Sequence, residues 1–106
     1  MILDDASIVR NITSMSELKL FMSRHGIRVV KKKTSEMFGY AGIHIEKRED
    51  WGIKIPYNTI WVDESIHGRE LFRTLKHEVE EMFLMRERGM KYFPAHKKAF
   101  KDETRR

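Results

Sequence analysis

Apolar residues recur at helical spacing near the start of the chain. Over residues 14–25 they fall three and four positions apart, which is the spacing of one helix face. The residues of that face are Leu18, Phe21 and Met22. Ser14 can form a capping box with Glu17, and Gly26 is a natural stop. The pattern predicts a first helix at residues 14–25.

The middle of the chain, residues 27–62, changes to short runs in which apolar and polar residues alternate. Strands are expected from Ile27 through the lysines that follow it, over residues 40–46, and in one or two further segments at 53–55 and 58–62. The connections between these segments are short, and parallel neighbours need longer crossovers. We therefore expect a small, mostly antiparallel sheet.

The second half of the chain is dominated by one long helical pattern. Asp63 or Ser65 can begin this helix, which runs to about Arg88 and is capped by Gly89. Its apolar stripe consists of Leu71, Leu75, Val79, Met82 and Phe83. A stripe of this kind is expected to lie on the sheet.

A short turn separates the long helix from a last one. Pro94 suits the first position of a helix, and this helix is expected to end near Glu103. A chain of 106 residues has the length of one domain and can bury a core without disulfides. The elements together predict a single α+β domain over residues 1–106, with a helix, a small sheet, a long helix and a C-terminal helix.

Composition narrows the chemistry that the chain can perform. It has no cysteine, so any metal site must use histidine, carboxylate and water. Its apolar runs are too short for a transmembrane helix, so no membrane partner is expected. Asp4 and Asp5 stand where a secretory signal would be basic, which favours a cytoplasmic location. Abundant charge without any glutamine is typical of a thermophile's protein.

The net charge of +5 is concentrated in two stretches of the sequence. Arg28 to Lys33 contains four basic residues, and the C-terminal end is rich in lysine and arginine. Such clusters can follow the phosphates of a nucleic acid. They can equally be solvated edges of the fold, and no recognised nucleic-acid motif accompanies them. Nucleic-acid binding is therefore the less favoured interpretation.

The long helix carries the residues with the clearest chemistry. His77 and Glu81 are four residues apart, so their side chains share a helix face and can reach one metal ion. Packing of the last helix against this one would bring His96 toward Glu81. Two histidines and one glutamate leave a fourth position for water, which is the ligand composition of several catalytic zinc sites. The sequence thus predicts a Zn²⁺ site at His77, Glu81 and His96.

Glu78 follows the first of these residues and is displaced from it by about 100° around the helix. This offset places its carboxylate beside the metal, where it could accept a proton from water. The alternatives are ordinary structural roles. Glu81 could pair with a surface cation such as Arg73 or Arg88, and His96 could bond to the backbone at the start of its helix.

Two segments resemble the minimal zincin-like metallopeptidases, of the minigluzincin type. They are His77-Glu78-x-x-Glu81 and Tyr92-x-x-Ala95-His96-x-x-Ala99. The resemblance implies a zinc-dependent peptidase, with His77, Glu81 and His96 as metal ligands and Glu78 as general base. In the better-known gluzincin order both histidines precede the glutamate, whereas here the second histidine and the glutamate have exchanged helices.

The remaining candidate residues keep two interpretations each. Tyr92 could donate a hydrogen bond to a developing oxyanion or pack its ring. Glu103 could orient His96 from behind the metal or play no role. Glu80 is expected to be solvated, and His44 to be structural or solvent-facing.

Two functions follow from these observations. The first is a small zinc metallopeptidase that acts on a peptide or protein substrate, with a homo-oligomer as an open alternative to a monomer. The second is a non-catalytic, metal-stabilised module that binds nucleic acid or a protein through its basic patches.

Overall fold

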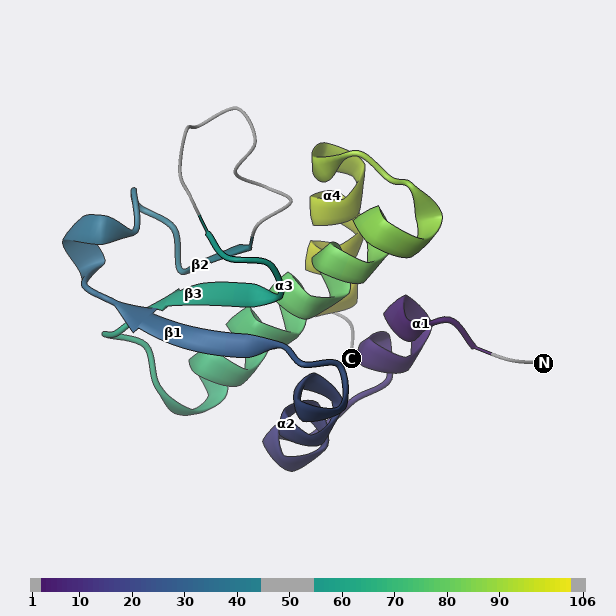
Figure 1. Ribbon diagram of the computed structural model, residues 1–106, viewed down its shortest axis with the longest axis horizontal. Coiled ribbons are helices and arrows are strands. Elements are labelled where there is room, and N and C mark those ends of the chain that lie inside the picture. The colour runs from purple at the N-terminus through teal and green to yellow at the C-terminus, as the bar shows by residue number, and fades with distance from the viewer. Residues whose placement is uncertain (1–2, 45–54, 104–106) are drawn as a thin grey trace.

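The computed structural model describes residues 3–44 and 55–103. Two short helices come first, a small sheet follows, and two longer helices complete the chain (Figure 1). The elements are α1 (Asp5–Arg10), α2 (Met15–Arg24), β1 (Arg28–Lys32), the 3-10 helix η1 (Thr34–Glu36), β2 (Gly42–His44), β3 (Thr59–Asp63), α3 (Gly68–Arg88) and α4 (Tyr92–Glu103). This order confirms the expected α+β layout.

The three strands form one sheet in the order β1-β3-β2. β2 pairs with β3 in antiparallel fashion, with His44 opposite Ile60. β1 pairs with β3 in parallel, with Arg28 opposite Thr59. The sheet is therefore mixed, with one pairing of each kind. The parallel pairing is possible because the long connection between β1 and β3, which includes β2, is sufficient for a crossover.

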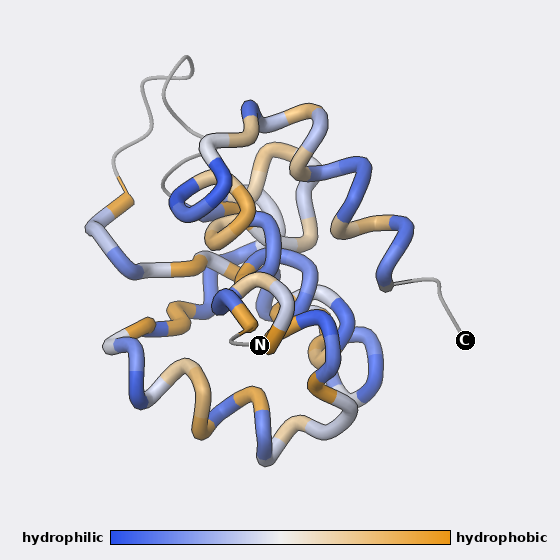
Figure 2. The backbone as a smooth tube through the Cα atoms, turned by 90° about the vertical axis from the view of Figure 1, so that its right-hand side faces the viewer, coloured by the Kyte–Doolittle hydropathy of each residue, from blue (hydrophilic) through white to orange (hydrophobic). Residues whose placement is uncertain are grey.

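Helix α3 crosses one side of the sheet and is the centre of the core (Figure 1). The sheet covers it on one side, while α1 and α4 pack against it elsewhere. Every residue of α3 from His77 to Leu84 is buried, charged residues included. Figure 2 shows hydrophobic and hydrophilic stretches alternating along the helices, as expected for helices that bury one side.

The helix ends agree with the capping signals in the sequence. The hydroxyl of Ser14 accepts a hydrogen bond from the backbone N–H of Glu17 at the start of α2. Gly89 ends α3 with φ of 62°, a left-handed conformation that glycine adopts without strain. Helix α4 is an exception: it begins at Tyr92, so Pro94 is its third residue and not its first as expected, and it runs to Glu103.

Two local features differ from the sequence-based expectation. Helix α3 begins at Gly68, because Asp63 instead ends β3 and accepts a hydrogen bond from the N–H of Ser65. Helix α1 was not expected at all. Of the strand expected at residues 53–55, the first two residues lie outside the described part of the chain.

Among the described residues, no helix combines the length and the apolar character that a membrane span requires.

Candidate metal centre

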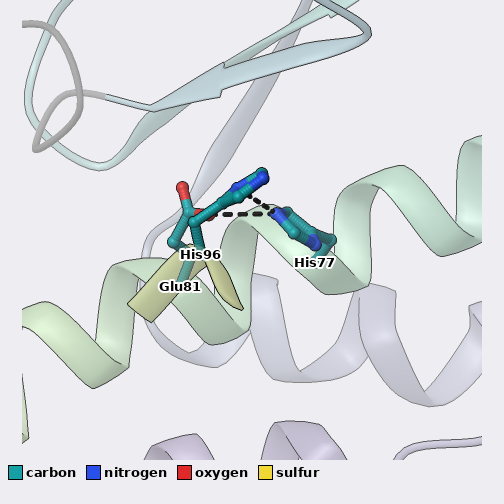
Figure 3. A group of neighbouring side chains, drawn as sticks. All are labelled: His77, Glu81 and His96. Carbon is teal, nitrogen blue, oxygen red and sulfur yellow. Dashed lines mark hydrogen bonds and ion pairs between the residues drawn. The ribbon is translucent and has the colours of Figure 1, made fainter. Parts of the chain in front are cut away.

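His77, Glu81 and His96 meet between α3 and α4, with their side chains pointing toward one another (Figure 3). The Nε2 atom of His77 lies 3.0 Å from Oε2 of Glu81 and 3.1 Å from Nδ1 of His96. The third distance, from Nδ1 of His96 to the same Glu81 oxygen, is 2.8 Å. The fold thus brings together the three residues that the sequence predicts as metal ligands.

The local sequence explains how α4 delivers His96 to this place. Ala95 and Ala99 are fully buried, at 0% and 1% exposure. Two small residues four apart on one face let α4 approach α3 closely, since no long side chain stands between the backbones. His96 follows Ala95 directly, so it projects from the rim of this contact and stays partly exposed.

Three hydrogen bonds cannot account for all three contacts of this triangle. Each imidazole nitrogen carries at most one hydrogen, and an ionised carboxylate carries none. If both nitrogens donate to Glu81, neither has a lone pair left to accept a hydrogen bond across the 3.1 Å contact between the histidines. If one of the two nitrogens carries no hydrogen, at least one of the three contacts brings two lone pairs together. A cation among the three atoms removes the conflict, because every lone pair can then point at it.

The separations between donor atoms also suit a metal ion. Ligands at the usual zinc distances in a tetrahedral site lie about 3.3 Å from one another. The observed 2.8–3.1 Å is slightly tighter than this value. Glu81 is completely buried and His77 is 7% exposed, so a metal there would be shielded on the side of the core. These residues could hold a divalent metal.

The other oxygen of Glu81 contacts His44, whose role the sequence did not indicate. The Nε2 atom of His44 lies 2.6 Å from Oε1 of Glu81, and both side chains are fully buried. Burial by itself raises the pKa of Glu81, but the hydrogen bonds from His44 and His77 outweigh it and lower the pKa below its usual range. Glu81 is therefore ionised in the folded protein.

The strand alternation contained a signal for His44. Ile43 packs with Met37 and Ile55 in a separate apolar cluster. Its neighbours Gly42 and His44 must then face the opposite side of the sheet, toward α3. The sequence did not indicate that Glu81 is the partner of His44, because β2 comes to lie over Glu81 in the folded protein.

Glu78 lies beside the three donors, under β2. One of its oxygens is 4.0 Å from Nε2 of His77, and the residue is 4% exposed. A Cβ atom at position 42 would stand 2.8 Å from Cγ of Glu78, closer than real contacts allow. Gly42 therefore makes room for the Glu78 side chain. His44, Glu78 and Glu81 form a second group whose donor atoms lie within 4.8 Å of one another.

Tyr92 contributes a hydroxyl to the edge of the cluster. Its Oη atom is 3.3 Å from Nδ1 of His96. Burial, followed by the negative charge of Glu81, raises the pKa of Tyr92 well above its usual value, so the hydroxyl keeps its proton.

An open pocket of about 250 Å³ leads to these residues from the surface. Its walls come from the segment around β2, from α3 and from α4. The lining residues are Tyr40, Ala41, Gly42, Thr74, His77, Glu78, His96 and Phe100. The candidate centre is thus reachable by a small molecule from the surface.

Two expectations about glutamates have different outcomes. The expectation that Glu80 is solvated is wrong: α4 covers it, and it is 2% exposed. Burial, together with a hydrogen bond to Asp102, raises the pKa of Glu80 to about 9. The side chain of Glu103 lies outside the described part of the structure.

One of the two surface partners considered for Glu81 is engaged elsewhere. Arg88 forms an ion pair with Asp4, with 2.8 Å between Nε and Oδ2.

Comparisons of the chain with protein-family models, characterised proteins and solved structures gave no match.

Proposed function

We propose that this protein is a zinc-dependent hydrolase that cleaves peptide bonds, with His77, Glu81 and His96 as its metal ligands. The observation that supports it best is the triangle of donor atoms, whose 2.8–3.1 Å separations leave an unresolved hydrogen-bond conflict without a cation. The resemblance of the two sequence segments to minimal zincin-like peptidases points to the same chemistry.

The donor set favours zinc over the harder metals. Two imidazole nitrogens and one carboxylate oxygen are typical zinc ligands, while magnesium and calcium prefer oxygen alone. Three protein ligands leave one position of a tetrahedral site for water or substrate. His96 is the partly exposed ligand, so that position is expected on the pocket side.

A bound zinc ion would lower the pKa of water and polarise a carbonyl group. Glu78 would accept the proton released by that water and pass it to the leaving amine. Its carboxylate stands beside the ligands, and Gly42 leaves it space. Tyr92 would donate its hydroxyl hydrogen to the negative charge that develops on the carbonyl oxygen, a role that suits its raised pKa.

Substitution of Glu78 by glutamine tests this proposal. Glutamine keeps the shape of the side chain but cannot accept the proton, so Glu78→Gln should retain zinc and lose hydrolysis by a factor of about a hundred or more. The assay measures cleavage of a fluorogenic peptide library by zinc-loaded protein, with metal content determined on the same samples.

Glu70→Gln is the matched control, because Glu70 is an exposed glutamate on the same helix. It should leave both metal content and cleavage unchanged. Equal cleavage by the Glu78 variant and the wild-type protein would contradict the role of general base. Absence of cleavage in every zinc-loaded sample would contradict the peptidase proposal while leaving the metal site intact.

A second candidate function is nucleic-acid binding by a metal-stabilised module. It is favoured by β1, an edge strand that exposes Arg28 and Lys31. Binding of labelled single-stranded RNA or DNA, titrated with salt, would separate the two functions. A steep fall of affinity with salt, together with no hydrolysis, would support the module.

A further inference from the structure

His44 occupies a position that the proposed metal chemistry does not yet use. It lies on β2, far from α3 and α4 in the sequence, and it is completely buried. Its Nε2 atom contacts Oε1 of Glu81, whereas the contacts to His77 and His96 use Oε2 of the same carboxylate. The two oxygens of Glu81 thus face different partners.

The distance decides between two roles for His44. Two ligands of one zinc ion lie about 3.3 Å apart. The 2.6 Å between His44 and Glu81 is much shorter and fits a charge-assisted hydrogen bond. His44 belongs to the separate group with Glu78 and Glu81, and not to the group formed by His77, Glu81 and His96. The contact is therefore a hydrogen bond that Nε2–H of His44 donates to the carboxylate.

We infer that His44 is a positioning residue, which holds Glu81 through Oε1 so that Oε2 is presented to the metal between α3 and α4. This inference rests on the proposed metal site. A carboxylate fixed at one oxygen loses less rotational freedom when the other binds a metal, and it keeps its orientation in the metal-free protein. The sheet thereby takes part in a site whose ligands all come from helices.

A pair of polar substitutions that differ only in reach tests this role. The amide nitrogen of glutamine in His44→Gln can approach the place of Nε2, whereas the side chain of His44→Asn is one methylene shorter. Loss of such a supporting hydrogen bond costs metal affinity by about 10- to 100-fold. We expect zinc affinity of His44→Asn to fall by that factor and that of His44→Gln to stay within about threefold of wild type.

The measurement is competition for zinc with a chromophoric chelator, with zinc stoichiometry and circular dichroism recorded on each sample. Ile43→Ala is the control, because it weakens the packing of β2 on the opposite side of the sheet without touching Glu81. It should bind zinc as tightly as wild type. A loss of affinity in Ile43→Ala equal to that in His44→Asn would overturn the inference.

Other outcomes are equally decisive. Equal zinc affinities for His44→Gln and His44→Asn, at any level, would contradict a role that depends on reach. Two zinc ions per wild-type chain and one per His44 variant would make His44 a ligand of a second ion, which also overturns the inference. If the wild-type protein binds no zinc, the proposed function itself fails, and this result is distinguishable from the others.

Discussion

Glu80 and Glu81 are neighbours on α3, yet the fold gives them opposite protonation states. Glu81 is surrounded by imidazole nitrogens that stabilise its negative charge. Glu80 points to Asp102 of α4, so a second carboxylate and burial both oppose its ionisation. Adjacent residues on a helix differ by about 100° in direction, which is enough to place them in different surroundings. The identity of the neighbouring side chain, and not the residue type, decides the charge.

The raised pKa of Glu80 predicts a pH dependence of stability. The folded protein holds a proton on Glu80 up to about pH 9, while the unfolded chain releases it near the ordinary glutamate pKa of 4.5. Because the folded state binds the extra proton in this window, the free energy of unfolding falls as pH rises from about 5 to 9. This group can contribute up to about 1.4 kcal/mol per pH unit.

Glutamine at this position keeps a donor for Asp102 and has no proton to lose. Glu80→Gln should therefore be more stable than wild type at pH 8 to 9, and the two should converge near pH 5. Urea unfolding at several pH values measures the difference in the free energy of unfolding, to which titrating groups remote from Glu80 contribute nothing. Parallel stability curves for the two proteins would show that Glu80 ionises normally in the fold.

At the scale of elements, the start of α2 and the end of α3 could be predicted, whereas the pairing of the strands could not. Ser14 and Gly89 act on the backbone next to them, so their effect is visible in a short stretch of sequence. Helix α1 has only six residues and is held from a distance: the Glu87 carboxylate accepts hydrogen bonds from the N–H groups of Asp5 and Ala6. No local pattern reveals such a partner.

Helix α4 is held to α3 by two kinds of contact, apolar and polar. Ala95 and Ala99 pack closely, while His96 contacts the side chains of His77 and Glu81 on α3. A metal that binds only the folded state stabilises it by mass action, by about 4 kcal/mol at a thousand times the dissociation constant. The first turns of α4 contain His96, so metal binding should stabilise these turns most.

Hydrogen exchange with zinc and with a chelator tests this expectation. Removal of zinc should speed amide exchange in residues 92–103 before it affects β3, because local opening follows the weakest contacts. Amides of α2, which does not touch the cluster, serve as the internal reference. Identical exchange of α4 in both conditions would mean that the metal does not contribute to holding this helix.

At the scale of the whole molecule, the part of the candidate site that lies on α3 and α4 could be predicted from the sequence. The spacing of His77 and Glu81 is a local property, and the short turn at Gly89 limits where His96 can go. His44 depends on strand order, in which β3 runs between β1 and β2. That order is decided by the packing of the sheet on α3, so residues distant in sequence become neighbours only in the complete fold.

The zinc content of purified protein is the most direct test of the central claim. After dialysis against limiting free zinc, elemental analysis should find one zinc per wild-type chain. His77→Ala and His96→Ala should each lose the metal, while His67→Ala, which removes an exposed histidine outside the cluster, should retain it. Full zinc retention in both cluster variants, or no zinc in the folded wild-type protein, would contradict the account.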